Sequence, residues 1–426
     1  MFRIDDENKI ISSQECRAAI VGIQKNRDIS YSMEELAGLA EAAGAHVAGQ
    51  MIQKTEKMNP ATLIGAGKVL ELAEICESME LDTVIFNEEL NGAQIRNLEN
   101  ALDRRVIDRT ILILDIFAMR ALSKEGRLQV ELAQLKYRLP RLTGFGKSLS
   151  RLGGGIGTRG PGEKKLETDR RHINKRINDI KKELIHIKTS REAQNSKRKR
   201  SRIPVVALVG YTNSGKSALM NRMLEMTEKE EKSVASEDML FASLDTQHRS
   251  IKLKDGKTFI LVDTVGFVSE LPHMFLDAFK ATLEEAAHAD LLLQVTDLTC
   301  QDQDFHNEVT KKVLEEIGAG NKEKITVYNK ADMVPENEIP VYGSCYVAVS
   351  AETGDNMETL MKMIQSRIFA DRIDVSLLIP YSNGELFSYI CERGTVKTKE
   401  YVEEGIRVKA QIPQKDYHRV KAYEII

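Results

Sequence analysis

The sequence predicts an α/β protein built from several domains and a helical arm. Three observations lead to this fold class. Strand-like and helix-like segments alternate from residue 32 to residue 113. Two further segments, Leu128–Leu139 and Ile173–Ile187, carry narrow apolar seams with the spacing of a coiled coil. Finally, the apolar run Ile203–Val209 is followed directly by G-x-x-x-x-G-K-S, the order of a strand, a phosphate-binding loop and a helix.

Length and composition indicate the number of domains and the cellular compartment. A chain of 426 residues is too long for one hydrophobic core and suggests two or three domains. Its five cysteines form no C-x-x-C pair and no metal-binding pattern, which favours a reducing compartment. The N-terminal segment lacks the apolar region of a signal peptide, and no uncharged apolar run approaches ~18 residues. We therefore expect a cytoplasmic protein without a membrane span.

The first domain, residues 1–121, is predicted to be a parallel sheet with helices on its faces. Ser32-Met-Glu-Glu35 reads as a capping box that opens a helix to Ala43, with Gly44 placed to end it. Then follow strand Ala45–Gln53, helix Gly67–Ser78, strand Asp82–Phe86, helix Asn91–Leu102 and strand Arg105–Ile113. Gly65-Ala-Gly-Lys68 resembles a phosphate-binding loop superficially, but Val69 follows the lysine. A second nucleotide site there stays open as an alternative.

The arm is predicted over residues 122–201 as an antiparallel hairpin of two helices. The first helix, Ser123–Leu139, presents Leu128, Leu132, Leu135 and Leu139 at 4,3,4 spacing. The second, Glu163–Ser196, presents Ile173, Ile177, Ile180, Leu184 and Ile187 at 4,3,4,3 spacing. At 1.5 Å per residue, the second helix would be about 50 Å long.

Charge is concentrated on this second helix. Between Glu163 and Arg202 there are fifteen Lys and Arg residues against six Asp and Glu residues, a balance of +9 in a chain whose net charge is −3. Such asymmetry points to an anionic partner. A solvated charged helix face accounts for it equally well.

The connection between the two helices, Gly144–Gly162, reads GFGKSLSRLGGGIGTRGPG, with eight glycines and no acidic residue. A flexible linker is the ordinary interpretation of such a composition. However, a loop at the far end of a stiff arm serves no core, its glycines permit close backbone approach, and its cations suit phosphates. We therefore predict a probe for structured RNA, with contacts at Lys147, Arg151, Gly153, Gly154, Gly155 and Arg159.

The motif that begins at Gly210 predicts a nucleoside triphosphate site. Its glycines let backbone N–H groups turn onto the phosphates, Lys216 reaches the β- and γ-phosphates, and the Ser217 hydroxyl is placed to bind Mg²⁺. The start of the next helix adds its positive dipole end. The candidate loop residues are Gly210, Tyr211, Thr212, Asn213, Ser214, Gly215, Lys216 and Ser217.

Three later motifs extend this site, each at the end of a predicted strand, where open α/β sheets bind ligands. In Asp263-Thr264-Val265-Gly266, the aspartate would hold Mg²⁺ through water and the glycine N–H would meet the γ-phosphate. In Asn329-Lys330-Ala331-Asp332, the last carboxylate would accept the N1–H and N2–H groups of guanine. Adenine would leave it unpaired, at a cost of about 1–3 kcal/mol or more. In Ser350-Ala351-Glu352, a backbone N–H would touch guanine O6. The four motifs together resemble translation-factor-like small GTPases.

Three longer segments carry a more specific resemblance. SRLGGGIGTRGPGEKKLETDRR (Ser150–Arg171), LQVELAQLKYRLPRL (Leu128–Leu142) and DTVGFVSELPHMFLDAFKATLEE (Asp263–Glu285) are similar to the HflX family of ribosome-associated GTPases, over about Ser30 to Ala370. The resemblance implies an N-terminal α/β domain with a helical arm, a Ras-like GTPase domain, here 202–370, and a small α+β C-terminal domain, here 371–426. It also implies binding to the large ribosomal subunit, which several members use to dissociate stalled or idle ribosomes.

The same resemblance identifies the switch I residues. Phe241-Ala242-Ser243-Leu244-Asp245 aligns with F-A-T-L-D in the family, so Ser243 takes the place of the threonine that binds Mg²⁺ in the GTP state. The following residues, Thr246–Arg249, depart from the usual P-T. The candidate catalytic residues are Lys216, Ser243 and Gly266. The candidate Mg²⁺ ligands are Ser217, Ser243 and, through water, Asp263.

Two residues bear on the rate of hydrolysis. Phe267 follows the D-x-x-G motif where Ras-like enzymes carry the glutamine that orients water, so we expect slow intrinsic hydrolysis and stimulation by a partner. Asn213 is the residue type that some related GTPases use to hold K⁺, and loop-shaping hydrogen bonds are the alternative role.

Taken together, these residues predict a Mg²⁺-dependent GTPase whose nucleotide state gates binding to the large ribosomal subunit, with K⁺ as a candidate second cation. We expect a monomer that is partly ribosome-associated. An assembly factor for pre-ribosomal particles and a regulatory switch with a protein partner remain as alternatives. Neither an antibiotic-resistance role nor the role of the C-terminal domain follows from the sequence.

Overall fold

The computed structural model describes residues 16–26, 28–141, 161–201, 203–227, 247–253, 255–267, 283, 285–300, 302–340 and 343–425. The side chains of the helix that begins at residue 161 are described from Glu167 to Thr189. The chain divides into two compact units, one formed mainly by residues up to Thr189 and the other mainly by residues from Ser190 onward. Each unit is described by itself.

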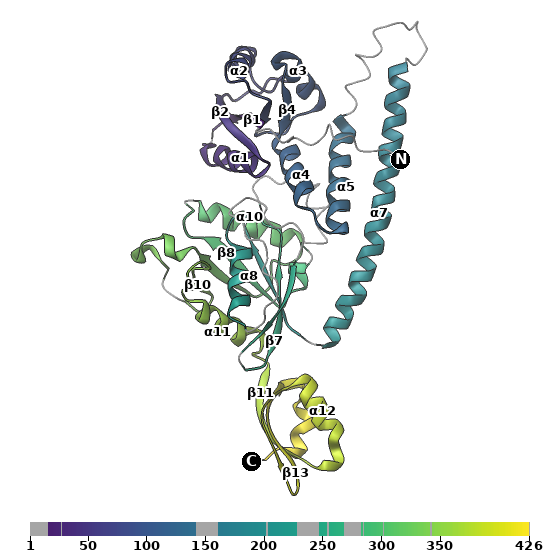
Figure 1. The fold of residues 1–426 in the computed structure, drawn as a ribbon, viewed down its shortest axis with the longest axis vertical. Coiled ribbons are helices and arrows are strands. Elements are labelled where there is room, and N and C mark those ends of the chain that lie inside the picture. Colours follow the sequence, from purple (N-terminus) through teal and green to yellow (C-terminus); the bar gives the residue numbers. More distant parts are fainter. Residues whose placement is uncertain are drawn as a thin grey trace. The chain divides into compact units, whose positions relative to one another are not determined.

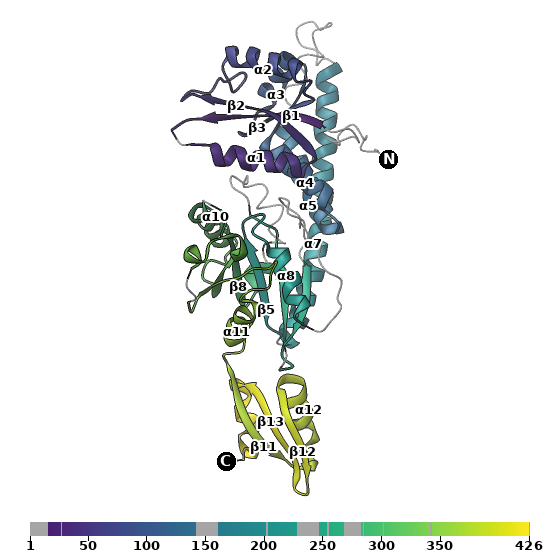
Figure 2. The ribbon, with the colours of Figure 1, turned by 60° about the vertical axis from the view of Figure 1, so that its left-hand side comes forward.

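The first unit contains a four-stranded parallel sheet in the order β2-β1-β3-β4. Helices α2 and α3 cover one face of this sheet, and α1 and α4 cover the other (Figure 2). The predicted alternation of strands and helices is therefore confirmed, although the central strand β1 was missed. The strands are β1 (Cys16–Gln24), β2 (Ala45–Lys54), β3 (Thr83–Phe86) and β4 (Arg105–Asp108), and the helices are α1 (Ser30–Ala42), α2 (Ala66–Ser78), α3 (Gly92–Leu102) and α4 (Arg109–Arg120).

The predicted capping box is wrong, because helix α1 begins at Ser30 and both of its supposed capping residues lie inside the helix. The Ser32 hydroxyl donates to Asn87 Oδ1 at 3.2 Å. The Glu35 carboxylate is buried and pairs with the guanidinium of Arg109. Ser32 therefore joins α1 to the residue after β3, and Glu35 joins it to α4, which the local pattern could not indicate.

The predicted strand Arg105–Ile113 is also partly wrong. Strand β4 ends at Asp108, and α4 follows without a loop. The fully buried Asp108 carboxylate caps this helix by accepting the N–H of Ile111 at 2.9 Å, and it also accepts the N–H of Leu90 at 3.0 Å. Ile111–Leu114 is an unbroken apolar run because most of α4 is buried, so it shows no helical period.

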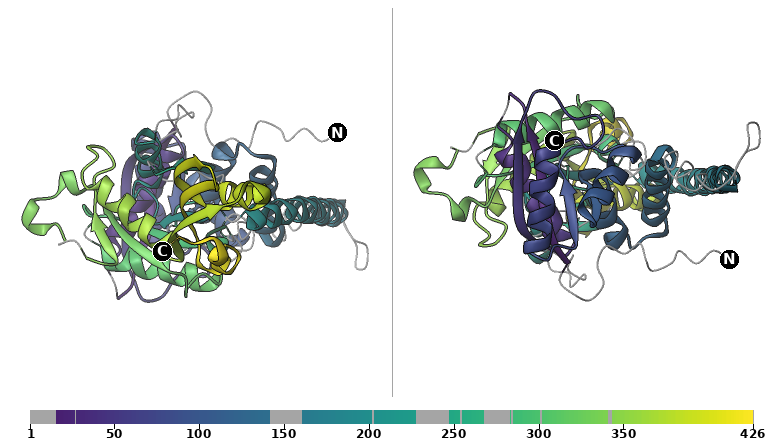
Figure 3. Two further views of the ribbon diagram at one scale, coloured as in Figure 1. Left: turned by 90° about the horizontal axis from the view of Figure 1, so that it is seen from below. Right: turned by 90° about the horizontal axis from the view of Figure 1, so that it is seen from above.

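Two long helices, α5 (Lys124–Arg141) and α7 (Pro161–Ser201), form the arm (Figures 1 and 3). The leucines of the α5 seam and the isoleucines of the α7 seam pack into one apolar cluster, as predicted. Ion pairs flank this cluster at Lys124–Glu183, 3.3 Å, and at Glu131–Arg176, 2.7 Å. Residue numbers in these pairs run in opposite directions, so the two helices are antiparallel.

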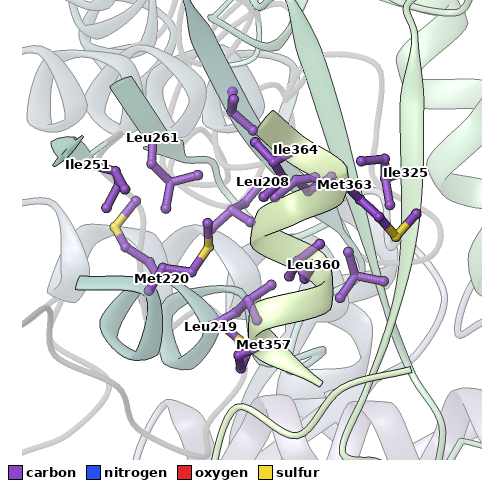
Figure 4. Packing of buried hydrophobic residues seen from close by; sticks show 14 of the residues in the cluster. Leu208, Leu219, Met220, Ile251, Leu261, Ile325, Met357, Leu360, Met363 and Ile364 are labelled. Carbon is purple, nitrogen blue, oxygen red and sulfur yellow. The ribbon is translucent and has the colours of Figure 1, made fainter. Parts of the chain in front are cut away.

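The second unit is centred on a six-stranded sheet in the order β10-β9-β8-β5-β7-β6, in which only β6 is antiparallel. Helices α8 and α11 cover one face, and their leucines and methionines pack on the strands beneath them (Figure 4). The strands are β5 (Val205–Gly210), β6 (Gln247–Lys252), β7 (Thr258–Asp263), β8 (Leu291–Asp297), β9 (Lys324–Asn329) and β10 (Tyr346–Ala348), and the helices are α8 (Lys216–Glu225), α10 (Gln303–Glu316) and α11 (Met357–Ile368).

The C-terminal residues form a three-stranded antiparallel sheet in the order β11-β13-β12, with its own apolar core. It is built from β11 (Arg372–Ile379), α12 (Gly384–Arg393), β12 (Thr395–Val402), β13 (Gly405–Pro413) and the short helix α13 (Tyr417–Val420). The predicted α+β character of this part is confirmed. Across the described residues, no helix combines the length and apolarity needed to cross a lipid bilayer.

Candidate functional site

The predicted nucleotide motifs meet at one edge of the six-stranded sheet. Strand β5 ends at Gly210, its neighbour β7 ends at Asp263, and β9 ends at Asn329. These strands are parallel, so their carboxyl ends lie together at the edge where open α/β sheets bind ligands. The local sequence produces this arrangement because each motif directly follows a buried apolar strand.

The loop after β5 requires glycine at two positions. Gly210 has φ of 151°, and a Cβ atom there would lie 2.2 Å from the carbonyl oxygen of Val295. Gly215 has φ of 85°, and its Cβ would lie 2.1 Å from Nδ2 of Asn329. Both backbones are in the left-handed region, which side chains disfavour. The loop therefore approaches two neighbouring strands more closely than any side chain would allow.

Lys216 is buried at the start of helix α8, with its ammonium group over this loop. Its Nζ donates to the carbonyl oxygens of Gly210 at 3.1 Å and Tyr211 at 2.7 Å. Burial lowers the pKa of Lys216 to about 8, against the opposing attraction of the Asp263 carboxylate. An incoming phosphate would strongly stabilise the charged form of this desolvated ammonium group.

The residue types beside Lys216 suit a magnesium ion. The Ser217 hydroxyl donates to Oδ2 of Asp263 at 2.6 Å, and the carboxylate is 1% exposed. A hydroxyl and a carboxylate are the oxygen ligands that Mg²⁺ takes next to a phosphate. In the loop itself, the buried hydroxyls of Thr212 and Ser214 have no hydrogen-bond partner among the described residues. Such donors also suit a polyanionic ligand.

The D-x-x-G segment is joined to the phosphate-binding loop by backbone hydrogen bonds. The Thr212 N–H donates to the Phe267 carbonyl at 2.7 Å, and the Phe267 N–H donates to the Gly210 carbonyl at 3.0 Å. A Cβ atom on Gly266 would lie 2.8 Å from Cα of Thr212. The Phe267 ring is 1% exposed and therefore has no polar group to offer to an attacking water.

Asn329 links the phosphate-binding loop to the loop expected to contact the base. Its Nδ2 donates to the Ser214 carbonyl at 3.0 Å, and its Oδ1 accepts the Ala351 N–H at 3.0 Å. The following Lys330 has φ of 64° and pairs with Asp297 at 2.8 Å. Asp332 is exposed, so its carboxylate is accessible to a ligand.

Two contacts of this site were not predicted. The ring of Tyr211 stacks on that of His306 in α10, with centroids 3.7 Å apart and planes 8° apart. Arg222 in α8 donates through Nε to the Ala351 carbonyl at 2.8 Å. Neither His306 nor Arg222 belongs to a nucleotide motif, and each contact joins segments far apart in the sequence, so no local signal could have indicated it.

Comparisons with known proteins decide the family. Family models match residues 30–118 as the N-terminal region and 120–198 as the middle region of a GTP-binding GTPase, residues 205–330 as a 50S ribosome-binding GTPase, and residues 342–421 as the HflX C-terminal domain. GTPase HflX of Caldanaerobacter subterraneus subsp. tengcongensis is 46% identical over 409 residues, covering 96% of this chain and 94% of that protein. This chain belongs to the HflX family of GTPases. The predicted resemblance and the GTPase activity are thereby confirmed.

A second relative agrees with this assignment. GTPase HflX of Escherichia coli is 38% identical over 412 residues, covering 95% of each chain. Among solved structures, a GTP-binding protein from the archaeon Sulfolobus solfataricus in complex with GDP is 26% identical, covering 83% of this chain and 98% of that chain, with a TM-score of 0.45.

Several predicted HflX site residues lie outside the described part of the chain. Phe241–Asp245 in switch I, with the proposed Mg²⁺ ligand Ser243, are among them. So are the candidate RNA contacts of the glycine-rich tip, Lys147, Arg151, Gly153, Gly154, Gly155 and Arg159. Their roles stay predictions.

Asn213, the candidate K⁺ ligand, has φ of 59° and is exposed. Within the described residues its side chain makes no hydrogen bond, so the alternative role in shaping the loop has no support there. In the N-terminal domain, Gly65 is the ordinary N-cap of α2, and Lys68 pairs with Glu71 at 2.6 Å. No feature of this turn favours a second nucleotide site.

The described part of α7 has an exposed basic face. Within the described residues, five exposed cations on this helix form no ion pair: Arg170, Arg171, Lys175, Lys181 and Lys182. The neighbouring acid Glu183 instead lies within 4 Å of cations, Arg176 and, on α5, Lys124. The described part of the helix therefore presents unpaired cations to solvent, while Glu183 is held by cations of the arm itself.

Proposed function

We propose that this HflX GTPase binds GTP with Mg²⁺ at the edge of the six-stranded sheet, and that its nucleotide state gates binding to the large ribosomal subunit. By binding the large subunit, the protein would dissociate stalled or idle ribosomes. The GTP part rests on the convergence of the four motifs. The ribosomal part rests on one observation, the unpaired basic face of α7.

Each residue of the nucleotide site has a stated role in this proposal. Lys216 neutralises the β- and γ-phosphates, the Gly266 N–H meets the γ-phosphate, and Asp332 reads the N1–H and N2–H edge of guanine. Ser217, with Ser243 and a water held by Asp263, would bind Mg²⁺, whose positive charge stabilises the charge that develops on the transferring phosphate. Asn213 would hold K⁺ near the same phosphates.

The proposed catalytic cycle depends on the partner. Because the ring of Phe267 is apolar and buried, no side chain at this position can orient the attacking water. Intrinsic turnover should therefore be slow, and the ribosome should supply what the site lacks. Phosphate release measured with and without large subunits tests this step. Exchanging Na⁺ for K⁺ in the same assay tests the role of Asn213.

RNA is the chemistry that best matches the basic face of α7. Solvent-facing cations on one face of a rigid helix suit a row of phosphates, which would position the arm without reading sequence. The glycine-rich tip would then reach furthest into the RNA. An acidic protein surface would also attract these cations, but it would not produce the steep salt dependence of phosphate binding.

The experiment is a salt titration of binding to purified large subunits, in the presence of a GTP analogue. Arg171→Gln combined with Lys175→Gln should weaken binding and reduce the log–log salt slope by up to about one unit for each phosphate that the variant no longer neutralises. Lys68→Gln combined with Lys312→Gln is the matched control, because these lysines lie elsewhere and are already ion-paired. If both double variants bind as the wild type does, α7 does not bind the RNA. Preference for pre-ribosomal particles would instead favour an assembly role.

A further inference from the structure

We propose that Arg222 is a positioning residue for guanine recognition. It fixes the loop that reads O6 of the base by holding two of that loop's carbonyl groups from the phosphate-binding helix. This inference deepens the proposed GTP site and rests on the proposed contact between the Ser350–Glu352 loop and the base.

Arg222 lies in α8, the helix whose first residue is Lys216. Its Nε donates to the Ala351 carbonyl at 2.8 Å, and its Nη2 donates to the Glu352 carbonyl. Its Nη1 pairs with Glu225 at 2.9 Å. All three nitrogen atoms of the guanidinium are engaged, so the side chain has one preferred orientation, and the loop is tied to the same helix that faces the phosphates.

These contacts determine where the loop's own N–H groups point. A peptide unit is planar, and its carbonyl and N–H point in opposite directions. The peptide whose carbonyl is held by Arg222 carries the N–H of Glu352, which must therefore point away from Arg222. The preceding N–H, that of Ala351, is already donated to Oδ1 of Asn329 at 3.0 Å.

The Glu352 N–H is therefore the donor that remains for the base. The next N–H, that of Thr353, donates to Oγ of Ser350 at 3.0 Å. Among the described residues, the Glu352 N–H makes no hydrogen bond. An unused donor beside the predicted guanine loop matches O6 of guanine, an acceptor, and opposes N6 of adenine, a donor. The sequence predicted a backbone N–H of Ser350–Glu352 as the O6 donor, and this inference assigns that role to the N–H of Glu352.

Asp332 and the loop held by Arg222 would thus contact different edges of one base. Asp332 would respond to the N1–H and N2–H groups, whereas the loop held by Arg222 would respond only to the atom at position 6. Two analogues separate these contacts. In 6-thioguanosine diphosphate the oxygen is replaced by sulfur, a weak acceptor, and in inosine diphosphate the 2-amino group is missing.

The experiment measures the affinities of the full-length protein for GDP and for both analogues. In Arg222→Met, GDP affinity should fall by on the order of tenfold, because two charge-assisted hydrogen bonds to the loop are removed. The preference for GDP over 6-thioguanosine diphosphate should shrink toward one, while the preference for GDP over inosine diphosphate should stay at the wild-type value. Arg222→Lys can hold only one carbonyl, so it should lower GDP affinity and the preference over 6-thioguanosine diphosphate in the same direction but by less. This variant replaces the methionine variant if that one does not fold.

The matched control is Arg367→Met. Arg367 in α11 likewise donates to a backbone carbonyl, that of Ser344, at 2.9 Å, and pairs with Glu323, but it holds a different loop. Its removal should leave both preferences unchanged. An equal loss for all three nucleotides in the Arg222 variants would show a general structural role and overturn the inference. Asp332→Asn tests the proposed site separately, since an unchanged preference for GDP over inosine diphosphate in that variant would contradict base recognition and not the role of Arg222.

Discussion

The buried ammonium group of Lys216 makes nucleotide affinity depend on pH. Burial lowers its pKa from 10.5 to about 8 in the nucleotide-free protein, a shift that corresponds to about 3 kcal/mol of disfavoured charge. A bound phosphate replaces the missing hydration of the ammonium, so the pKa should return toward its ordinary value in the complex. Nucleotide binding then takes up a proton above pH 8.

The size of the effect follows from this linkage. At pH 9 about one tenth of the nucleotide-free molecules carry the charged lysine, against about nine tenths at pH 7. GDP affinity should therefore fall roughly tenfold between these two pH values. The assay is calorimetric titration of the nucleotide-free protein with GDP at half-unit steps of pH.

The control is Lys216→Arg, whose guanidinium stays charged over the whole range. Guanine loses its own N1 proton at alkaline pH, and the slope that remains in the arginine variant measures this contribution. Equal slopes in the two proteins would refute the reasoning. If the variant binds too weakly, unfolding of the nucleotide-free proteins gives the same answer. Because the unfolded wild type holds more protons between pH 8 and 10.5, its stability should rise with pH there, and that of the variant should not.

Three further predictions use other parts of the chain. Asp332→Asn should lower guanine nucleotide affinity by at least about 1–3 kcal/mol and raise the preference for xanthine, and unchanged GTP binding would remove this residue from the site. Gly215→Ala should abolish nucleotide binding, since its Cβ would lie 2.1 Å from Asn329 Nδ2, whereas Gly67→Ala, where a Cβ meets nothing within 4 Å, should leave binding unchanged. Burial raises the pKa of Asp115 to about 6, so its ionised form destabilises the fold above that pH. Asp115→Asn should therefore stabilise the protein by up to about 3 kcal/mol at pH 7 and by nothing near pH 4. Thermal unfolding at both pH values measures this gain in stability, and an equal gain at the two pH values would contradict the prediction.

The parts of the fold that the sequence predicts well are those governed by local rules. The arm is one example, because each seam repeats within a single helix and its partner is the next helix in the chain. The phosphate-binding loop is another, because the glycines at 210 and 215 are required by the backbone itself. Such features need no knowledge of distant residues.

The errors arise where distant residues decide. Ser32 and Glu35 match a capping box, yet Asn87 and Arg109 draw both side chains into a buried cluster instead. The apolar run Ile111–Leu114 looked like part of a strand, because a helix buried on most of its surface loses the helical period. Likewise, the role of Arg222 depends on carbonyl groups about 130 residues later in the chain, which no motif could supply.

The central claim is that the nucleotide state controls binding to the large ribosomal subunit. Co-sedimentation of the full-length protein with purified large subunits tests it most directly, with the protein loaded in parallel with a non-hydrolysable GTP analogue or with GDP. The account predicts that the analogue-loaded protein sediments with the subunits and that the GDP-loaded protein stays largely in the supernatant. Equal sedimentation in the two states, or none in either, would contradict it.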